Sequence, residues 1–128
     1  RRWVIAPTAD IVCRLKAAYP EVPVSGFPRG AGLLYEAYVA ETGVDGVSCD
    51  AGVPMSYARE TLQSRALVQG NLDNLAVVVG GAAMEREAKR ILKSLSGGPF
   101  VFNLGHGVLP QTPPEHVEAL AAIVRGWE

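Results

Sequence analysis

Four short apolar stretches punctuate the chain, and longer segments with helical spacing separate them. The stretches cover residues 22–27, 44–50, 66–69 and 100–104. Each is four to seven residues long and largely apolar. Such runs are typical of strands that are buried on both faces of a parallel sheet. The pattern therefore predicts four strands.

Between these stretches, apolar residues recur at spacings of three and four, which places them on one face of an amphipathic helix. This spacing is found in residues 8–19, 33–38, 84–95 and 117–127, and a shorter helix over 54–63 joins the second and third strands. Pro20 blocks continuation of the first helix. For the last helix we predict Thr112 as the N-cap, Pro113 in the first turn and Glu115 at position N3.

The element order is thus one helix followed by four strand–helix units, which predicts right-handed crossovers and a parallel sheet. Two architectures fit this order: a small doubly wound sheet, or four consecutive units of an eight-unit barrel. A complete barrel has roughly 250 residues, and this chain has 128. We therefore expect an α/β fold that forms half of a (β/α)8 barrel, as a single domain over residues 1–128.

Polar residues gather where each predicted strand ends. They are Ser25 in the first strand, Ser48 and Asp50 in the second, Gln69, Asn71 and Asp73 after the third, and Asn103 and His106 at the fourth. In βα folds the carboxyl ends of the strands carry the ligand site. The sequence therefore predicts a site on that rim.

Several of these residues have a simpler structural explanation. Asp73 is suited to cap the helix after the third strand, and Asp50 to end its strand through an Asx turn. Asn71 and Asn103 can satisfy backbone groups of the loops. We keep both asparagines as candidates for substrate contact on the rim.

His106 is the main candidate for substrate binding, and Arg29 is a further rim candidate beside the two asparagines, although a loop arginine can also be simply solvated. His106 lies between Gly105 and Gly107, and flanking glycines let a ligand approach the imidazole closely. Arg29 lies in a glycine-rich loop between a strand and a helix, where it can bind an anionic group. The other histidine, His116, is predicted to be a solvated residue in the first turn of the last helix.

Composition and charge exclude several classes of protein. The chain is 48% apolar and 20% charged, with a net charge of −1 and no run of five like charges, so we expect neither a nucleic-acid nor a membrane partner. No stretch has the roughly 20 apolar residues that cross a bilayer. Cys13 and Cys49 are far apart and form no CxxC motif, so reduced thiols, a cytoplasmic location and no metal site are expected. The missing initial Met suggests a piece of a longer chain.

Two sequence segments resemble a known family. They are Gln-Gly-Asn-Leu-Asp at 69–73 and Phe-Asn-Leu-Gly-His-Gly-Val-Leu-Pro-Gln-Thr-Pro-Pro-Glu at 102–115. Both resemble the carboxyl-terminal part of the uroporphyrinogen decarboxylase family, and the 27–32 loop and the 43–50 strand also follow its layout. Asn74 departs from the pattern, because the family usually has proline there.

The resemblance implies a (β/α)8 barrel enzyme of haem and tetrapyrrole biosynthesis. Such an enzyme removes four acetate carboxyl groups from uroporphyrinogen III to give coproporphyrinogen III, without metal or organic cofactor. It also implies a cytoplasmic homodimer. His106 matches the family histidine that contacts substrate, whereas the family's arginines, aspartate, tyrosine and serine lie upstream of this chain. We therefore expect the chain to be inactive alone and to associate through its exposed half-barrel face.

Three other interpretations remain at this point. A cobalamin-linked methyltransferase shares the broad fold, but the His-x-Cys pair that holds its zinc is absent from this sequence. A dinucleotide- or anion-binding module is suggested by Gly30-x-Gly32 with Asp50 at the end of the next strand, although Tyr35 occupies the third glycine position. The third is a non-catalytic interaction fragment.

Overall fold

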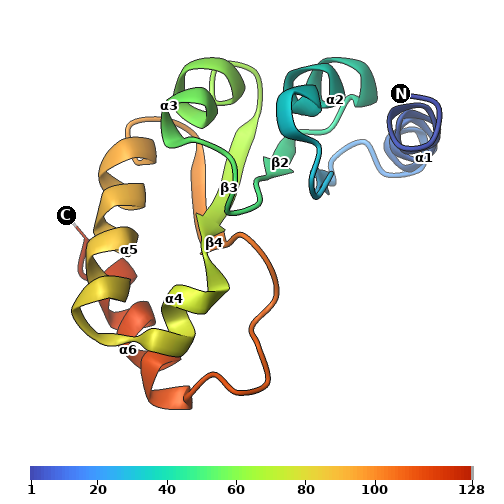
Figure 1. Ribbon diagram of the computed structural model, residues 1–128. Helices are drawn as coiled ribbons and strands as arrows, with labels where there is room; N and C mark the ends of the chain where they lie inside the picture. The colour runs from blue at the N-terminus through green and yellow to red at the C-terminus, as the bar shows by residue number, and fades with distance from the viewer. Residues whose placement is uncertain (128) are drawn as a thin grey trace.

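The computed structural model describes residues 1–127, which form a four-stranded parallel sheet. Its strands are β1 (Ser25–Gly26), β2 (Gly46–Ser48), β3 (Leu67–Leu72) and β4 (Phe100–Leu104). They lie in the order β1-β2-β3-β4 (Figure 1). A doubly wound sheet reverses its strand order at a switch point, whereas a barrel does not. The sequential order therefore confirms the barrel-type arrangement over the doubly wound one.

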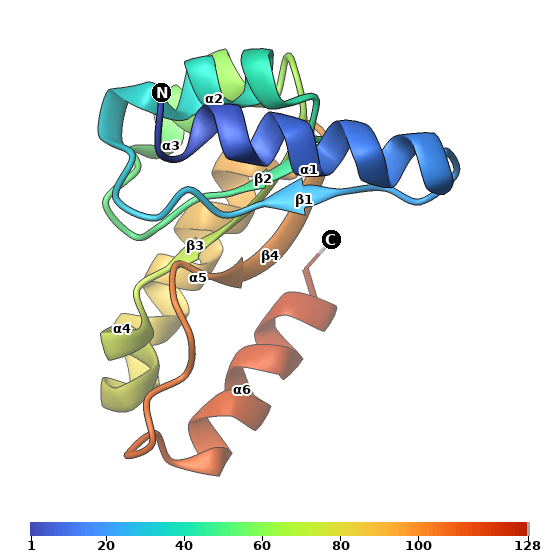
Figure 2. The ribbon, with the colours of Figure 1, turned by 90° about the vertical axis from the view of Figure 1, so that its right-hand side faces the viewer.

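Helices follow the strands in the predicted alternation, with one unpredicted division. The helical elements are α1 (Ile5–Ala18), η1 (Gly32–Leu34), α2 (Tyr35–Thr42), α3 (Met55–Tyr57), η2 (Ala58–Leu62), α4 (Asn74–Val79), α5 (Gly81–Leu95) and α6 (Pro114–Arg125). The segment between β3 and β4 forms two helices, because Gly80 at φ +68° and Gly81 at φ +59° adopt conformations that a helix cannot continue through. In Figure 2, α1 lies alongside α2 above the sheet.

The helices cover one face of the sheet and leave the other open. Val47 and Val68 are partners in the β2–β3 ladder, and both are completely buried in the core beneath the helices. On the opposite face, Ser25 and Asn103 are exposed, and Val101 keeps 42% of its surface accessible. α1, α2, α3 and α5 follow one another around one side of the curved sheet (Figure 1). An open inner face with helices outside is the arrangement of a barrel wall.

Several predicted boundaries are wrong. β1 and β2 cover only an inner part of the predicted stretches 22–27 and 44–50, and α1 begins at Ile5 and not at Thr8. β3 extends to Leu72, so Gln69 and Asn71 lie inside the strand and not after it, because β4 pairs with this segment as far as Leu104. The last helix begins one residue later than predicted, with Pro113 at the N-cap and Glu115 in the first turn. The Thr112 hydroxyl forms no hydrogen bond with any residue that the structure describes, so it does not cap α6.

Within residues 1–127, no helix combines the length and the apolar character needed to cross a membrane. The longest helix, α5, has 15 residues.

Candidate functional site

A hollow of about 470 Å³ lies at the carboxyl ends of the strands. Loops that follow all four strands line it, with the residues Arg29, Gly30, Asp50, Ala51, Gly52, Asn74, Gly105, His106 and Leu109. The structure therefore brings His106, the main candidate from the sequence, and Arg29, one of the further rim candidates, to one hollow on the predicted rim.

Asp50 holds the loops that form this hollow together. Its Oδ2 accepts hydrogen bonds from the Gly30 N–H (2.8 Å) and the Tyr35 O–H (2.9 Å), and its Oδ1 accepts one from the Gly52 N–H (3.0 Å). The bond to Gly52 confirms the predicted Asx turn. Because Gly30 directly follows Arg29, the Asp50 carboxylate fixes the arginine-bearing loop against the end of β2.

The hydrogen bonds to Asp50 also control its ionisation. Partial burial is the largest single influence and raises its pKa, but the hydrogen bonds from Gly30, Tyr35 and Gly52, together with the nearby Arg29 charge, lower the pKa below the ordinary value of 3.8. Burial has the dominant effect on Tyr35 and raises the pKa of its phenol. The carboxylate is therefore charged at neutral pH, and the phenol is a hydrogen-bond donor.

Replacing Asp50 by asparagine is expected to lower the free energy of unfolding at pH 7 by about 1–2 kcal/mol, since hydrogen bonds to a charged acceptor are lost. A carboxylate with a lowered pKa in the folded state stabilises the protein above its unfolded-state pKa, and this stabilisation is lost as pH falls through the folded-state pKa. The difference in Tm between the parent protein and Asp50→Asn should therefore shrink between pH 5 and pH 3. Thermal unfolding followed by circular dichroism measures it, and a difference that does not vary with pH would contradict the assignment.

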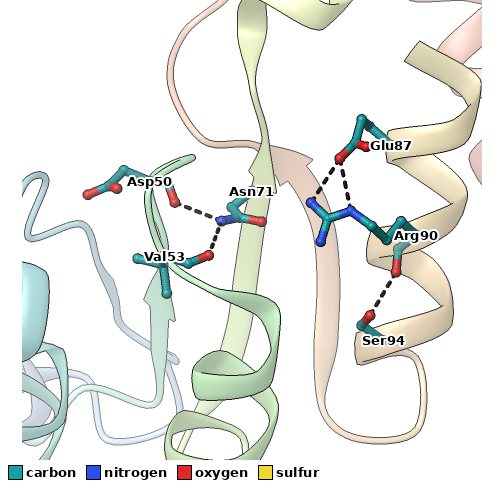
Figure 3. Close-up of polar contacts among 6 residues, drawn as sticks. All are labelled: Asp50, Val53, Asn71, Glu87, Arg90 and Ser94. Atoms are coloured by element: carbon teal, nitrogen blue, oxygen red, sulfur yellow. Dashed lines mark hydrogen bonds and ion pairs between the residues drawn. The ribbon is translucent and has the colours of Figure 1, made fainter. Parts of the chain in front are cut away.

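Asn71 lies behind the rim, with 4% of its surface exposed. Its Nδ2 donates hydrogen bonds to the carbonyl oxygens of Asp50 (2.7 Å) and Val53 (3.0 Å), as Figure 3 shows. This confirms that Asn71 satisfies loop backbone groups. Asn103 lies on the open face of β4, where its Oδ1 accepts a hydrogen bond from the Leu104 N–H (2.8 Å). For both asparagines, contact with substrate stays a prediction.

The loop after β4 carries His106, whose side chain is exposed. On one side, the Gly105 N–H donates to the Leu72 carbonyl oxygen (2.7 Å). On the other side, the Gly107 carbonyl oxygen accepts a hydrogen bond from Asn74 Nδ2 (2.8 Å). The backbone of His106 thus lies between two points of attachment, one to β3 and one to α4.

A second hollow, of about 440 Å³, lies on the other side of the loop after β2. Its charged side chains are engaged with one another or with backbone. Arg90 pairs with Glu87 (2.8 Å, Figure 3), and Asp73 accepts a hydrogen bond from the Leu75 N–H (2.9 Å), which confirms its predicted role as the cap of α4. Arg29, in contrast, forms no ion pair with any residue in the range 1–127. We therefore assign the candidate site to the hollow that holds Arg29 and His106.

His116 is not the solvated residue that the sequence predicted. It is half-buried, and its Nδ1 forms a 2.8 Å hydrogen bond with the Val77 carbonyl oxygen. The ring packs against Gly80, where a side chain would clash with it. His116 therefore joins α6 to α4 and does not belong to the site.

The family model and the relatives that match this chain carry the same description. A family model described as uroporphyrinogen decarboxylase matches residues 1–127. Proteins named uroporphyrinogen decarboxylase from Rhodospirillum rubrum and Granulibacter bethesdensis are 56% and 50% identical over 124 residues, and that from Sphingopyxis alaskensis is 53% identical over 125. The alignments cover 97–98% of this chain and 36% of each relative. The chain thus spans about a third of the length of these relatives.

Proposed function

Because the chain belongs to the uroporphyrinogen decarboxylase family, we propose that the protein carrying it converts uroporphyrinogen III to coproporphyrinogen III. The observation that carries the proposal is the meeting of Arg29 and His106 in one hollow at the carboxyl ends of the strands. The family is one of (β/α)8 barrels, and four consecutive βα units of this chain form a parallel part of such a barrel.

The two side chains suit a substrate that carries carboxylates on pyrrole rings. The Arg29 guanidinium can form paired hydrogen bonds with a carboxylate, which orients that side chain of the substrate. The His106 imidazole is proposed to contact the substrate and donate a hydrogen bond to another carboxylate. Gly105 and Gly107, the neighbours of His106 in the sequence, add no side chains of their own beside the imidazole.

The chemistry requires binding, orientation and balance of charge. Protonation of a pyrrole carbon creates a cation that accepts the electron pair left when carbon dioxide departs. The exocyclic methylene formed in this way gains a proton to become the methyl group, and the ring carbon loses the proton that it had taken up. The ring is thus its own electron sink, and we propose that the reaction needs no metal or organic cofactor. The role of the protein is to place each acetate group and to stabilise the charge that develops.

We also propose that residues 1–128 form a single domain, the carboxyl-terminal half-barrel, and that the protein is cytoplasmic. We propose from the family that the complete protein is a homodimer. For the chain alone we propose association through the open face that carries Ser25, Val101 and Asn103, because an uncovered sheet face and unpaired strand edges favour association.

One observation disfavours the dinucleotide-binding alternative. The N–H of Gly30, which a phosphate would need in a glycine-rich loop, already donates to Asp50. The same hydrogen bond occupies the Asp50 carboxylate, which in a dinucleotide site would have to bind the ribose. In addition, the first helical turn after the loop is a 3-10 turn, Gly32–Leu34, and α2 begins only at Tyr35.

The test compares two proteins: the complete protein that carries this chain, and the 128-residue chain alone. Each is incubated without oxygen with uroporphyrinogen III, and coproporphyrinogen is measured by chromatography, with the Rhodospirillum rubrum relative as the reference. We expect product from the complete protein and none above background from the chain alone. Product from the chain alone would show that the rest of the barrel is dispensable, and none from the complete protein would refute the proposed activity.

A further inference from the structure

We propose that Asn74 is a positioning residue that sets the place of the His106 imidazole in the hollow. The importance of Asn74 for catalysis rests on the proposed function, whereas its effect on the position of the His106 imidazole does not. Asn74 Nδ2 donates a 2.8 Å hydrogen bond to the carbonyl oxygen of Gly107, the residue next to His106. Asn74 itself lines the hollow together with His106 and Arg29.

The loop between β4 and α6 has few other attachments. Over residues 105–112, two hydrogen bonds join it to the rest of the described structure: the Gly105 N–H to Leu72 and the Asn74 side chain to Gly107. Figure 2 shows this loop running past α4 after it leaves β4. His106 is the one residue between these two bonds, so both must be present to fix its backbone on both sides.

The two attachments differ in kind. At Gly105 the backbone packs so closely against Ala51 and Asp50 that no side chain fits there. At Gly107 nothing lies within 4 Å of the position that a side chain would take. Packing therefore supports the first attachment, whereas at Gly107 itself the attachment is the hydrogen bond from Asn74.

This difference predicts which property changes when the Asn74 bond is lost. The Gly107 residue is exposed, so water can replace the lost donor and the protein loses little stability. The backbone of Gly107 then becomes free to rotate, and the imidazole shifts relative to Arg29. A displacement of about 1 Å at a reacting centre can lower a rate by up to about 100-fold.

The experiment uses the complete protein and the variants Asn74→Ala and Asn74→Asp. Both remove the donor, and the second preserves the size of the side chain in case the first folds poorly. We expect kcat/KM for uroporphyrinogen III to fall about tenfold in each, with little change in Tm. The matched control is Gln111→Ala, which truncates an exposed amide of the same loop that makes no side-chain hydrogen bond among the described residues, and should leave activity unchanged.

A double-mutant cycle separates positioning from a general structural effect. If Asn74 acts through His106, Asn74→Ala should cost nothing further in a protein that already carries His106→Gln. An equal loss in both backgrounds, or no loss in the parent background, would overturn the proposal.

A measurement without substrate distinguishes failure of this inference from failure of the proposed function. The NMR signal of the His106 ring, assigned by its disappearance in His106→Gln, should move or broaden in Asn74→Ala and stay unchanged in Gln111→Ala. An unchanged signal in Asn74→Ala refutes the positioning role whatever reaction the protein catalyses. A changed signal in a protein that does not decarboxylate uroporphyrinogen supports positioning and refutes the proposed function.

Discussion

Gly105→Ala is expected to lower the free energy of unfolding by roughly 3 kcal/mol, near the upper end for overpacking in a protein interior. A Cβ at this position would meet the backbone nitrogen of Ala51 and come within 2.9 Å of its Cα. Both atoms belong to the main chain after β2, so neither can move aside by a change of rotamer. Relief requires the loops after β2 and β4 to separate, which would also open the hollow and lower activity.

Gly107→Ala is the matched control, because this glycine also flanks His106 but has open space around it. Thermal unfolding of the two variants in the complete protein gives the comparison, with Gly107→Ala close to the parent in Tm. Equal Tm values for both variants would show that the two loops do not pack against each other as described.

His106→Gln is expected to lower kcat/KM for uroporphyrinogen III by about 100-fold, the lower end of the range for loss of a side chain that takes part in proton transfer or charge placement. Because the His106 side chain is exposed, Tm should change little. The kinetics are measured on the complete protein over a range of substrate concentrations, which separates kcat from KM.

The second histidine provides the control for this substitution. His116→Gln removes the hydrogen bond to Val77 between α6 and α4, so we expect a lower Tm with kcat near the parent value. Full activity in His106→Gln would remove His106 from the substrate site, and a large loss of kcat in His116→Gln would show that α6 contributes to it.

Much of this arrangement follows from local patterns. The four strands, the rim that carries His106 and Arg29, the cap by Asp73 and the turn at Asp50 all depend on residues close in sequence, where spacing and turn chemistry are informative. The two segments around 69–73 and 102–115 also identified the family correctly. The comparison with a typical barrel of roughly 250 residues holds for the four strand–helix units but not for length, since the chain covers 36% of its relatives.

Other features could not be predicted because their partners are distant in sequence. Asp50 accepts hydrogen bonds from Gly30 and Tyr35, which are 20 and 15 residues away, and His116 contacts Val77, which is 39 residues away. In the sequence, Asn74 differs from other residues of its segment only in departing from the family pattern. Its role depends on Gly107, 33 residues further along, and the position after a capping aspartate does not indicate such a contact.

The sequential strand order has a consequence for how the hollow forms during folding. Ser25 pairs with Gly46, Gly46 with Leu67, and Val68 with Phe100, so each ladder closes a segment of only about twenty to thirty residues. Short closures cost less chain entropy and favour rapid folding. The contacts of the Arg29 loop with the end of β2 therefore do not require β4, whereas the His106 loop can be positioned only where β3 and the loop after β2 are in place, because Gly105 bonds to Leu72 and packs on Ala51.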